Sequence, residues 1–100
     1  MKITQNIEDD TIEALVSGRL DTVTAPEAEL ILRGMADQCN QLILNLEDVS
    51  YISSAGLRVV LLLLKIMTAA GKKMSVKKPS EFCRQVFAAT GMDGILTIVS

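Results

Sequence analysis

Residues 41–57, QLILNLEDVSYISSAGL, decide the fold class of this chain. The apolar run at 41–46 predicts a short strand that is buried on both faces. The apolar series that follows Ser53 predicts a long helix over 54–70, and we expect residues 47–53 to form the loop between strand and helix. In open α/β sheets, functional loops gather beyond the carboxyl ends of the strands. The segment is therefore the first place to look for a functional site.

On the C-terminal side of the long helix, strand and helix patterns alternate. Pro79 favours a helix start, and Phe82, Val86 and Phe87 would share one face of that helix. The elements expected here are a strand at 73–77, a helix at 79–90 that ends at Gly91, and a strand at 95–99.

On the N-terminal side, two alternating segments flank the acidic pair Asp9-Asp10, which indicates a hairpin turn. Gly18 is expected to end the second strand, and Thr24 with Glu27 predicts a capping box at the next helix start. The elements expected here are strands at 2–6 and 11–17, a polar loop at 19–24 and a helix at 25–38.

The predicted order is β-β-α-β-α-β-α-β. Strands that alternate with helices imply parallel pairs joined by right-handed crossovers, and the opening hairpin adds an antiparallel edge. The 100 residues are enough for one domain and too few for two. We therefore expect a single α/β domain over 1–100, with a mixed sheet of about five strands and helices packed against it.

Composition excludes several classes of function. The chain has no histidine, so it contains no Ser-His-Asp triad and no histidine-ligated metal site. A net charge of −2 and 3% aromatic residues do not favour nucleic-acid binding. No cofactor or metal is expected.

Cys39 and Cys83 have no metal-ligand spacing, and we interpret them as buried or half-buried free thiols. The N-terminus has no apolar core of a signal peptide, and the longest apolar run, Val59 to Leu64, is too short to span a membrane. The expected location is the cytoplasm.

Ser53 and Ser54 stand at the start of the long helix and allow three interpretations. One of them caps the helix with its side chain, as serine often does. One of them is a nucleophile, although no histidine or other base is evident nearby. One of them is phosphorylated, which places a charge of about −1.5 to −2 on the surface that a partner would contact.

The long helix carries more apolar residues than one buried face requires. We expect burial of Leu57, Val60, Leu61 and Leu64 against the sheet, with Arg58 and Lys65 on the outer face. Val59, Leu62 and Leu63 would then stay partly exposed and form an apolar patch for a docking partner.

The stretch Leu44–Leu57, LNLEDVSYISSAGL, resembles the signature of the STAS domain family, and more narrowly that of bacterial anti-sigma factor antagonists. The resemblance extends along the whole chain. The other segments that carry it are Gly18-Arg19-Leu20-Asp21 with Thr24-Ala25, Ala70 to Met74, and Phe82 to Met92. Ser53 departs from the family pattern, which has aspartate at this position, although serine occurs there in other members.

The resemblance implies a switch between partners. The unphosphorylated antagonist would bind an anti-sigma factor that is also its serine kinase and thereby free a sigma factor. A PP2C-type phosphatase would restore the binding form. The phosphorylated residue is the serine two positions before the glycine, Ser54, with Ser53 as the alternative. Such a protein is not an enzyme and is expected to be monomeric when free.

The resemblance also implies which residues bind the partner. They surround the serine pair and are Asp21, Thr22, Thr24, Ser53, Ser54, Ala55, Gly56, Leu57, Arg58 and Leu61. Asp21 and Asp48 are the carboxylates expected near the serine, either as turn residues or as groups that orient it. Some STAS domains instead belong to lipid or anion transport systems, so a subunit or regulatory component of a membrane transport system is the alternative function.

Overall fold

A five-stranded mixed sheet organises the chain, with strand order β1-β2-β3-β4-β5. The structure, a computed structural model, describes residues 1–100. The β1–β2 pair is antiparallel and the three other pairs are parallel, as the predicted hairpin and crossovers require. The strands are β1 (Lys2–Glu8), β2 (Thr11–Leu20), β3 (Gln41–Ile52), β4 (Lys73–Lys77) and β5 (Ile98–Val99).

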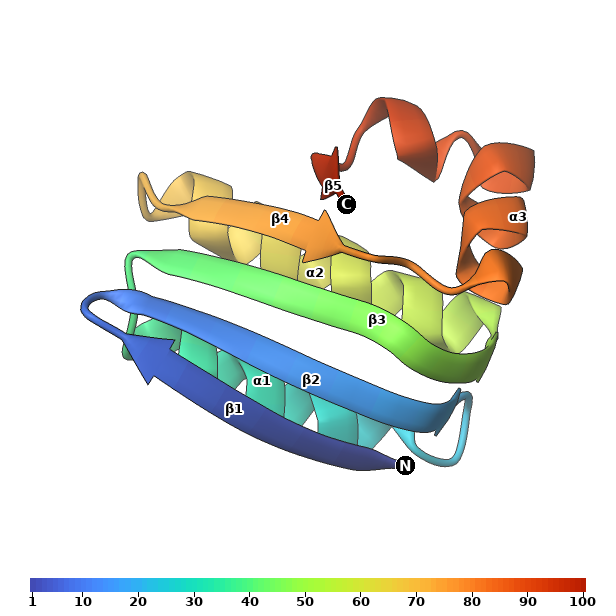
Figure 1. Cartoon of the computed structure of the whole chain (residues 1–100), viewed down its shortest axis with the longest axis horizontal. Coiled ribbons are helices and arrows are strands. Elements are labelled where there is room, and N and C mark those ends of the chain that lie inside the picture. Colours follow the sequence, from blue (N-terminus) through green and yellow to red (C-terminus); the bar gives the residue numbers. More distant parts are fainter.

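Three helices accompany the sheet. They are α1 (Ala25–Asp37), α2 (Ser54–Ala69) and α3 (Glu81–Thr90), and a short 3-10 helix, η1 (Met92–Gly94), follows α3. Figure 1 shows α1 and α2 side by side on one face of the sheet, with α3 at the end where β3 finishes. The predicted α/β class and the mixed five-stranded sheet are confirmed.

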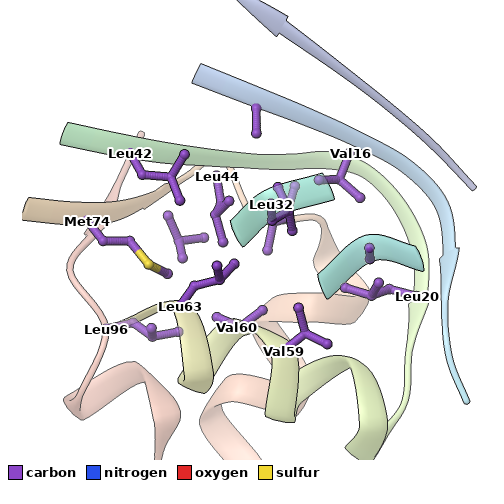
Figure 2. Close-up of a cluster of buried hydrophobic side chains, with 14 of the residues drawn as sticks. Val16, Leu20, Leu32, Leu42, Leu44, Val59, Val60, Leu63, Met74 and Leu96 are labelled. Atoms are coloured by element: carbon purple, nitrogen blue, oxygen red, sulfur yellow. The ribbon is translucent and has the colours of Figure 1, made fainter. Parts of the chain in front are cut away.

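The hydrophobic core fills the space between the sheet and these helices. Alternate residues of β2 point into it, so Ile12, Ala14 and Val16 are buried as their spacing predicts. Figure 2 shows side chains of the sheet, Leu42, Leu44 and Met74 among them, facing Leu32 of α1 and Val60 and Leu63 of α2. The core therefore fixes the positions of α1 and α2 relative to the carboxyl ends of the strands.

The predicted ends of β2 and β3 were wrong. β2 continues through Gly18 to Leu20, and β3 continues through the expected loop to Ile52, because residues 17–20 pair with 48–52. The register shifts between Leu15 and Ser17 and again between Gly18 and Arg19, where Gly18 has φ +89°. The exposed Asp48 resembles a loop residue, but its pairing with Ser17 of β2 keeps it in a strand.

The inward face of α2 also differs from the expectation. Val59 and Leu63, which we expected to stay partly exposed, are 3% and 0% exposed, whereas Leu57, Leu61 and Leu64 are only half-buried. The buried residues of α2 are Gly56, Val59, Val60, Leu63 and Met67. Arg58 and Lys65 are exposed on the outer face, as expected. At 100° per residue the buried set lies opposite these two side chains, whereas the three half-buried leucines flank them. The helical spacing therefore already indicated the buried face, and the expectation misassigned it.

The C-terminal third shows two smaller corrections. α3 begins at Glu81 rather than at Pro79, because the Ser80 side chain accepts a hydrogen bond from the Cys83 N–H at 3.2 Å and caps the helix. Phe82 lies on the exposed side of α3 and not on the face of the buried Phe87. The last strand has only two residues, Ile98 and Val99, instead of the five expected.

Candidate functional site

Ser53 and Ser54 lie where β3 passes into α2 without a loop. Ser53 occupies the N-cap position with extended backbone angles, and its N–H donates to the Leu20 carbonyl at 3.0 Å. Ser54 is the first residue of the helix and is exposed. The end of β2 therefore anchors the backbone of the serine pair.

The two hydroxyls have opposite surroundings. Ser53 Oγ is buried and has no hydrogen-bond partner, and Ser53 makes no side-chain cap bond to α2. The interpretation that a serine side chain caps α2 is therefore wrong for Ser53, the residue at the N-cap. Of the two hydroxyls, only that of Ser54 belongs to an exposed residue.

The turn at 21–24, between β2 and α1, is held by Asp21 and Thr24. Asp21 Oδ1 accepts from the N–H groups of Val23 and Thr24 at 3.0 and 3.1 Å, and Thr24 Oγ1 donates to the Arg19 carbonyl at 2.9 Å. Thr24 makes no cap bond to α1, so the predicted capping box with Glu27 does not form. Asp21 instead satisfies the N–H groups of Val23 and Thr24, which precede the helix.

Asp21 is also electrostatically stabilised. The hydrogen bond from the Thr24 N–H is the main reason that the pKa of Asp21 lies below its usual value, and Arg19 and Val23 act in the same direction. Arg19 Nε lies 3.3 Å from Asp21 Oδ2. The carboxylate thus stays charged while it orders the turn.

Gly56 lets α2 approach the end of β2. A Cβ atom added at Gly56 would lie 2.5 Å from the Leu20 carbonyl oxygen and 2.8 Å from the Ile52 side chain. Real Cβ atoms essentially never come this close to a backbone oxygen. The glycine therefore brings the serine pair and the 21–24 turn onto one surface.

A shallow groove of about 350 Å³ lies beside this surface, between the starts of α1 and α2. We call it the α1–α2 groove; its lining residues are Thr22, Ala25, Pro26, Glu29, Ala55, Arg58 and Val59. Three residues expected to bind a partner, Thr22, Ala55 and Arg58, meet here. The sequence interpretation missed Pro26 and Glu29, which only the pairing of α1 with α2 brings to the groove.

The remaining predicted residues do not line the groove. Asp21 and Thr24 lie in the turn next to it, Gly56 is buried where α2 approaches β2, and Leu57 and Leu61 are half-buried on α2. Asp48 does not line it. That residue is paired in register with Ser17 and lines a separate hollow with Lys2 and Thr4.

An aromatic contact near the turn was not anticipated. The Arg19 guanidinium lies 4.3 Å from the centre of the Tyr51 ring, and that ring lies 5.1 Å from the Phe82 ring. Only three aromatic residues occur in the chain, and two of them meet in this contact. A tyrosine within the predicted loop at 47–53 was the only signal in the sequence for it.

The two cysteines lie elsewhere. Cys39 and Cys83 are both free and buried, as expected, and burial raises the pKa of each thiol. None of the helices has the length and the apolar character needed to cross a membrane.

Comparison with known proteins gives the family. The family model for the STAS domain matches residues 3–100. The anti-sigma-B factor antagonist of Staphylococcus aureus is 30% identical over 99 residues, which cover 98% of this chain and 92% of that protein.

Solved structures share the fold. A Thermotoga maritima protein described as a candidate anti-sigma factor antagonist superposes with a TM-score of 0.90 at 24% identity, over 98% of this chain and 86% of that one. SpoIIAA, an anti-sigma factor antagonist and Bacillus cell fate determinant, gives TM-scores of 0.82 unphosphorylated and 0.76 phosphorylated. Both forms are 19% identical to this chain and cover 99% of it, and the chain covers 89% and 92% of them. The family match over residues 3–100, together with the shared fold, shows that the chain belongs to the STAS domain family.

Proposed function

We propose that this chain is an anti-sigma factor antagonist whose binding is switched by phosphorylation of Ser54. The unphosphorylated form binds an anti-sigma factor that is also a serine kinase, and this binding frees a sigma factor. A PP2C-type phosphatase reverses the modification. The chain itself has no enzymatic activity in this scheme, and it works in the cytoplasm as a monomer when free.

The difference in exposure between Ser54 and Ser53 is the observation that supports Ser54 as the phosphorylation site. A kinase must reach the hydroxyl oxygen, which attacks the γ-phosphorus of ATP while ADP leaves and the hydroxyl proton passes to a base of the kinase. Ser54 is exposed, whereas Ser53 Oγ is buried. Access therefore favours Ser54 and argues against Ser53.

The surroundings of Ser54 suit a phosphate group. The first turn of α2 contains no acidic residue, and a helix N-terminus stabilises negative charge. The fold would then tolerate the modification, and its effect would fall on a partner at the α1–α2 groove. A partner loses affinity there through like-charge repulsion and the cost of desolvating the phosphate.

The relatives support the same function. The Staphylococcus aureus relative is an anti-sigma-B factor antagonist that aligns over almost its whole length. SpoIIAA, which shares the fold, occurs in phosphorylated and unphosphorylated forms.

Phosphopeptide mapping of the protein from its own cells tests the proposal. Trypsin releases residues 34–58 as one peptide, which contains both serines and also Ser50 and Tyr51. We expect one phosphate on this peptide, assigned to Ser54 by fragment ions, lost in Ser54→Ala and retained in Ser53→Ala. A peptide that never carries phosphate, or a phosphate that persists in Ser54→Ala, contradicts the proposal.

Affinity capture from a cell lysate tests which class of protein binds the chain. We expect the unphosphorylated chain to retain a protein with an ATP-binding serine kinase domain, and Ser54→Asp to retain much less of it. Capture of permease and ATP-binding cassette subunits by both baits would instead establish the transporter alternative.

A further inference from the structure

Arg58 lies one helical turn after Ser54 on α2. Residues four apart on a helix have Cβ atoms about 5–6 Å from each other, and an anion placed N-terminal to the cation is the more favourable order. Both residues are exposed, so neither has to cross the core to meet the other. An anion on Ser54 would thus have a guanidinium within reach on its own helix.

Arg58 is the one arginine of the chain without a hydrogen-bond or ion-pair partner. Arg19 and Arg33 are paired with Asp21 and Glu29, and Arg84 donates to the Pro79 carbonyl. No acidic residue occurs on α2, so nothing on that helix competes for Arg58. Glu29 shares the α1–α2 groove with Arg58, but Arg33 Nη1 lies 3.5 Å from Glu29 Oε2.

We propose that Arg58 is the internal counterion of phosphorylated Ser54, so that the modification withdraws a cation from the rim of the α1–α2 groove as well as adding an anion. The inference rests on the proposed function, since it describes what phosphate at Ser54 does. A guanidinium binds phosphate oxygens in bidentate geometry, which an ammonium group cannot do. A partner carboxylate that contacts Arg58 in the unphosphorylated form would lose its cation at the switch.

The test uses the whole chain with phosphoserine genetically encoded at position 54, so that no kinase is required. Titration followed by ³¹P NMR gives the second pKa of the phosphate, which a nearby cation lowers. We expect Arg58→Gln to raise this pKa by ~0.5 unit and Arg58→Lys to raise it less. Circular dichroism of each variant checks that the fold is retained.

Lys65→Gln is the matched control, because it removes one positive charge from the exposed side of the same helix. Lys65 lies eleven residues beyond Ser54, or ~16 Å along the helix, which exceeds the screening length of ~8 Å at physiological salt. Equal shifts in Arg58→Gln and Lys65→Gln, or no shift in either, overturn the proposal. Because phosphoserine is genetically encoded at position 54, this titration tests only whether Arg58 pairs with the phosphate. The phosphopeptide map tests separately whether cells phosphorylate Ser54.

Discussion

At the scale of single residues, the neighbouring Ser53 and Ser54 differ in the exposure of their hydroxyl groups. Ser53 turns its hydroxyl into the protein, where it has no partner, and Ser54 lies on the surface. A buried hydroxyl without a partner costs about 1–3 kcal/mol relative to one that is hydrogen-bonded. Ser53 therefore contributes its backbone contact with Leu20 to the site, and its side chain lowers stability.

Ser53→Ala is accordingly expected to leave the free energy of unfolding unchanged or raise it by up to about 1 kcal/mol. Ser80→Ala is the matched control, because the Ser80 hydroxyl caps α3 and its loss is expected to cost ~1 kcal/mol. Urea denaturation of the two variants measures the difference. A loss in Ser53→Ala as large as that in Ser80→Ala would show that Ser53 Oγ has a stabilising partner.

Gly56→Ala tests the close approach of α2 to β2. The added methyl group meets the Leu20 backbone oxygen, which cannot move away as a flexible side chain could, so we expect a loss of about 1–3 kcal/mol in unfolding free energy. Gly34→Ala in α1 is the control, since nothing lies within 4 Å of its Cβ and alanine there is expected to stabilise by ~1 kcal/mol. If both variants gained stability in urea denaturation, the close contact would not exist.

At the scale of secondary-structure elements, polar side chains connect three neighbouring strands. Asn45 Nδ2 of β3 donates to Glu13 Oε2 of β2 at 2.9 Å, and Lys77 Nζ of β4 lies 3.5 Å from the same oxygen. Asn45 is the one polar residue in the buried set, and this bond satisfies its side-chain amide. The network thus ties together the strands that lead to the site.

The network predicts a pH dependence of stability. The hydrogen bond from Asn45 is the largest single cause that lowers the pKa of Glu13 below its ordinary value of 4.5, and the charge and a hydrogen bond of Lys77 act in the same direction. A lowered pKa in the folded state means that the stability from Glu13 is complete above pH ~4.5 and is lost as the pH falls through the lowered value. Stability measured by urea denaturation should therefore decline in acid, and less steeply in Glu13→Gln.

NMR titration of the Glu13 carboxyl separates the two partners. Asn45→Ala and Lys77→Ala should each raise the pKa of Glu13, because each removes an interaction that lowers it. A variant that leaves this pKa unchanged would show that its side chain does not act on Glu13.

At the scale of the whole molecule, one core encloses both thiols while the serine pair lies at its boundary. Cys39 and Cys83 are 4% and 0% exposed, and burial raises the pKa of each. Thiolate is the reactive form, so the folded chain should protect both cysteines from thiol reagents.

Labelling with a thiol reagent at pH 8 tests this arrangement. We expect Cys39 and Cys83 to react slowly in the native chain and rapidly in denaturant. Ser54→Cys should add one fast-reacting thiol to the native protein, and Ser53→Cys should not, because position 53 points inward. A fast thiol at position 53 would contradict the burial of that side chain.

Sequence patterns were sufficient to predict the structure wherever a residue's environment follows from its neighbours along the chain. The order of strands and helices, the span 73–77 of β4 and the inward residues of β2 all follow from alternation and helical spacing. The serine pair at the start of α2 was located in the same way. In each case, local chemistry and tertiary contacts favour the same structure.

Tertiary structure decided the features that depend on partners distant in sequence. Residues 48–52 became strand only through pairing with 17–20. The Thr24 hydroxyl donates to the Arg19 carbonyl instead of capping α1, and Asp21 orders the turn before the helix. The sequence alone determined the α/β order and where the serines lie, whereas contacts between β2, β3, α1 and α2 decided which serine is exposed and which residues share its surface. The physical reason is that burial and hydrogen bonding depend on the neighbours that the whole fold brings together.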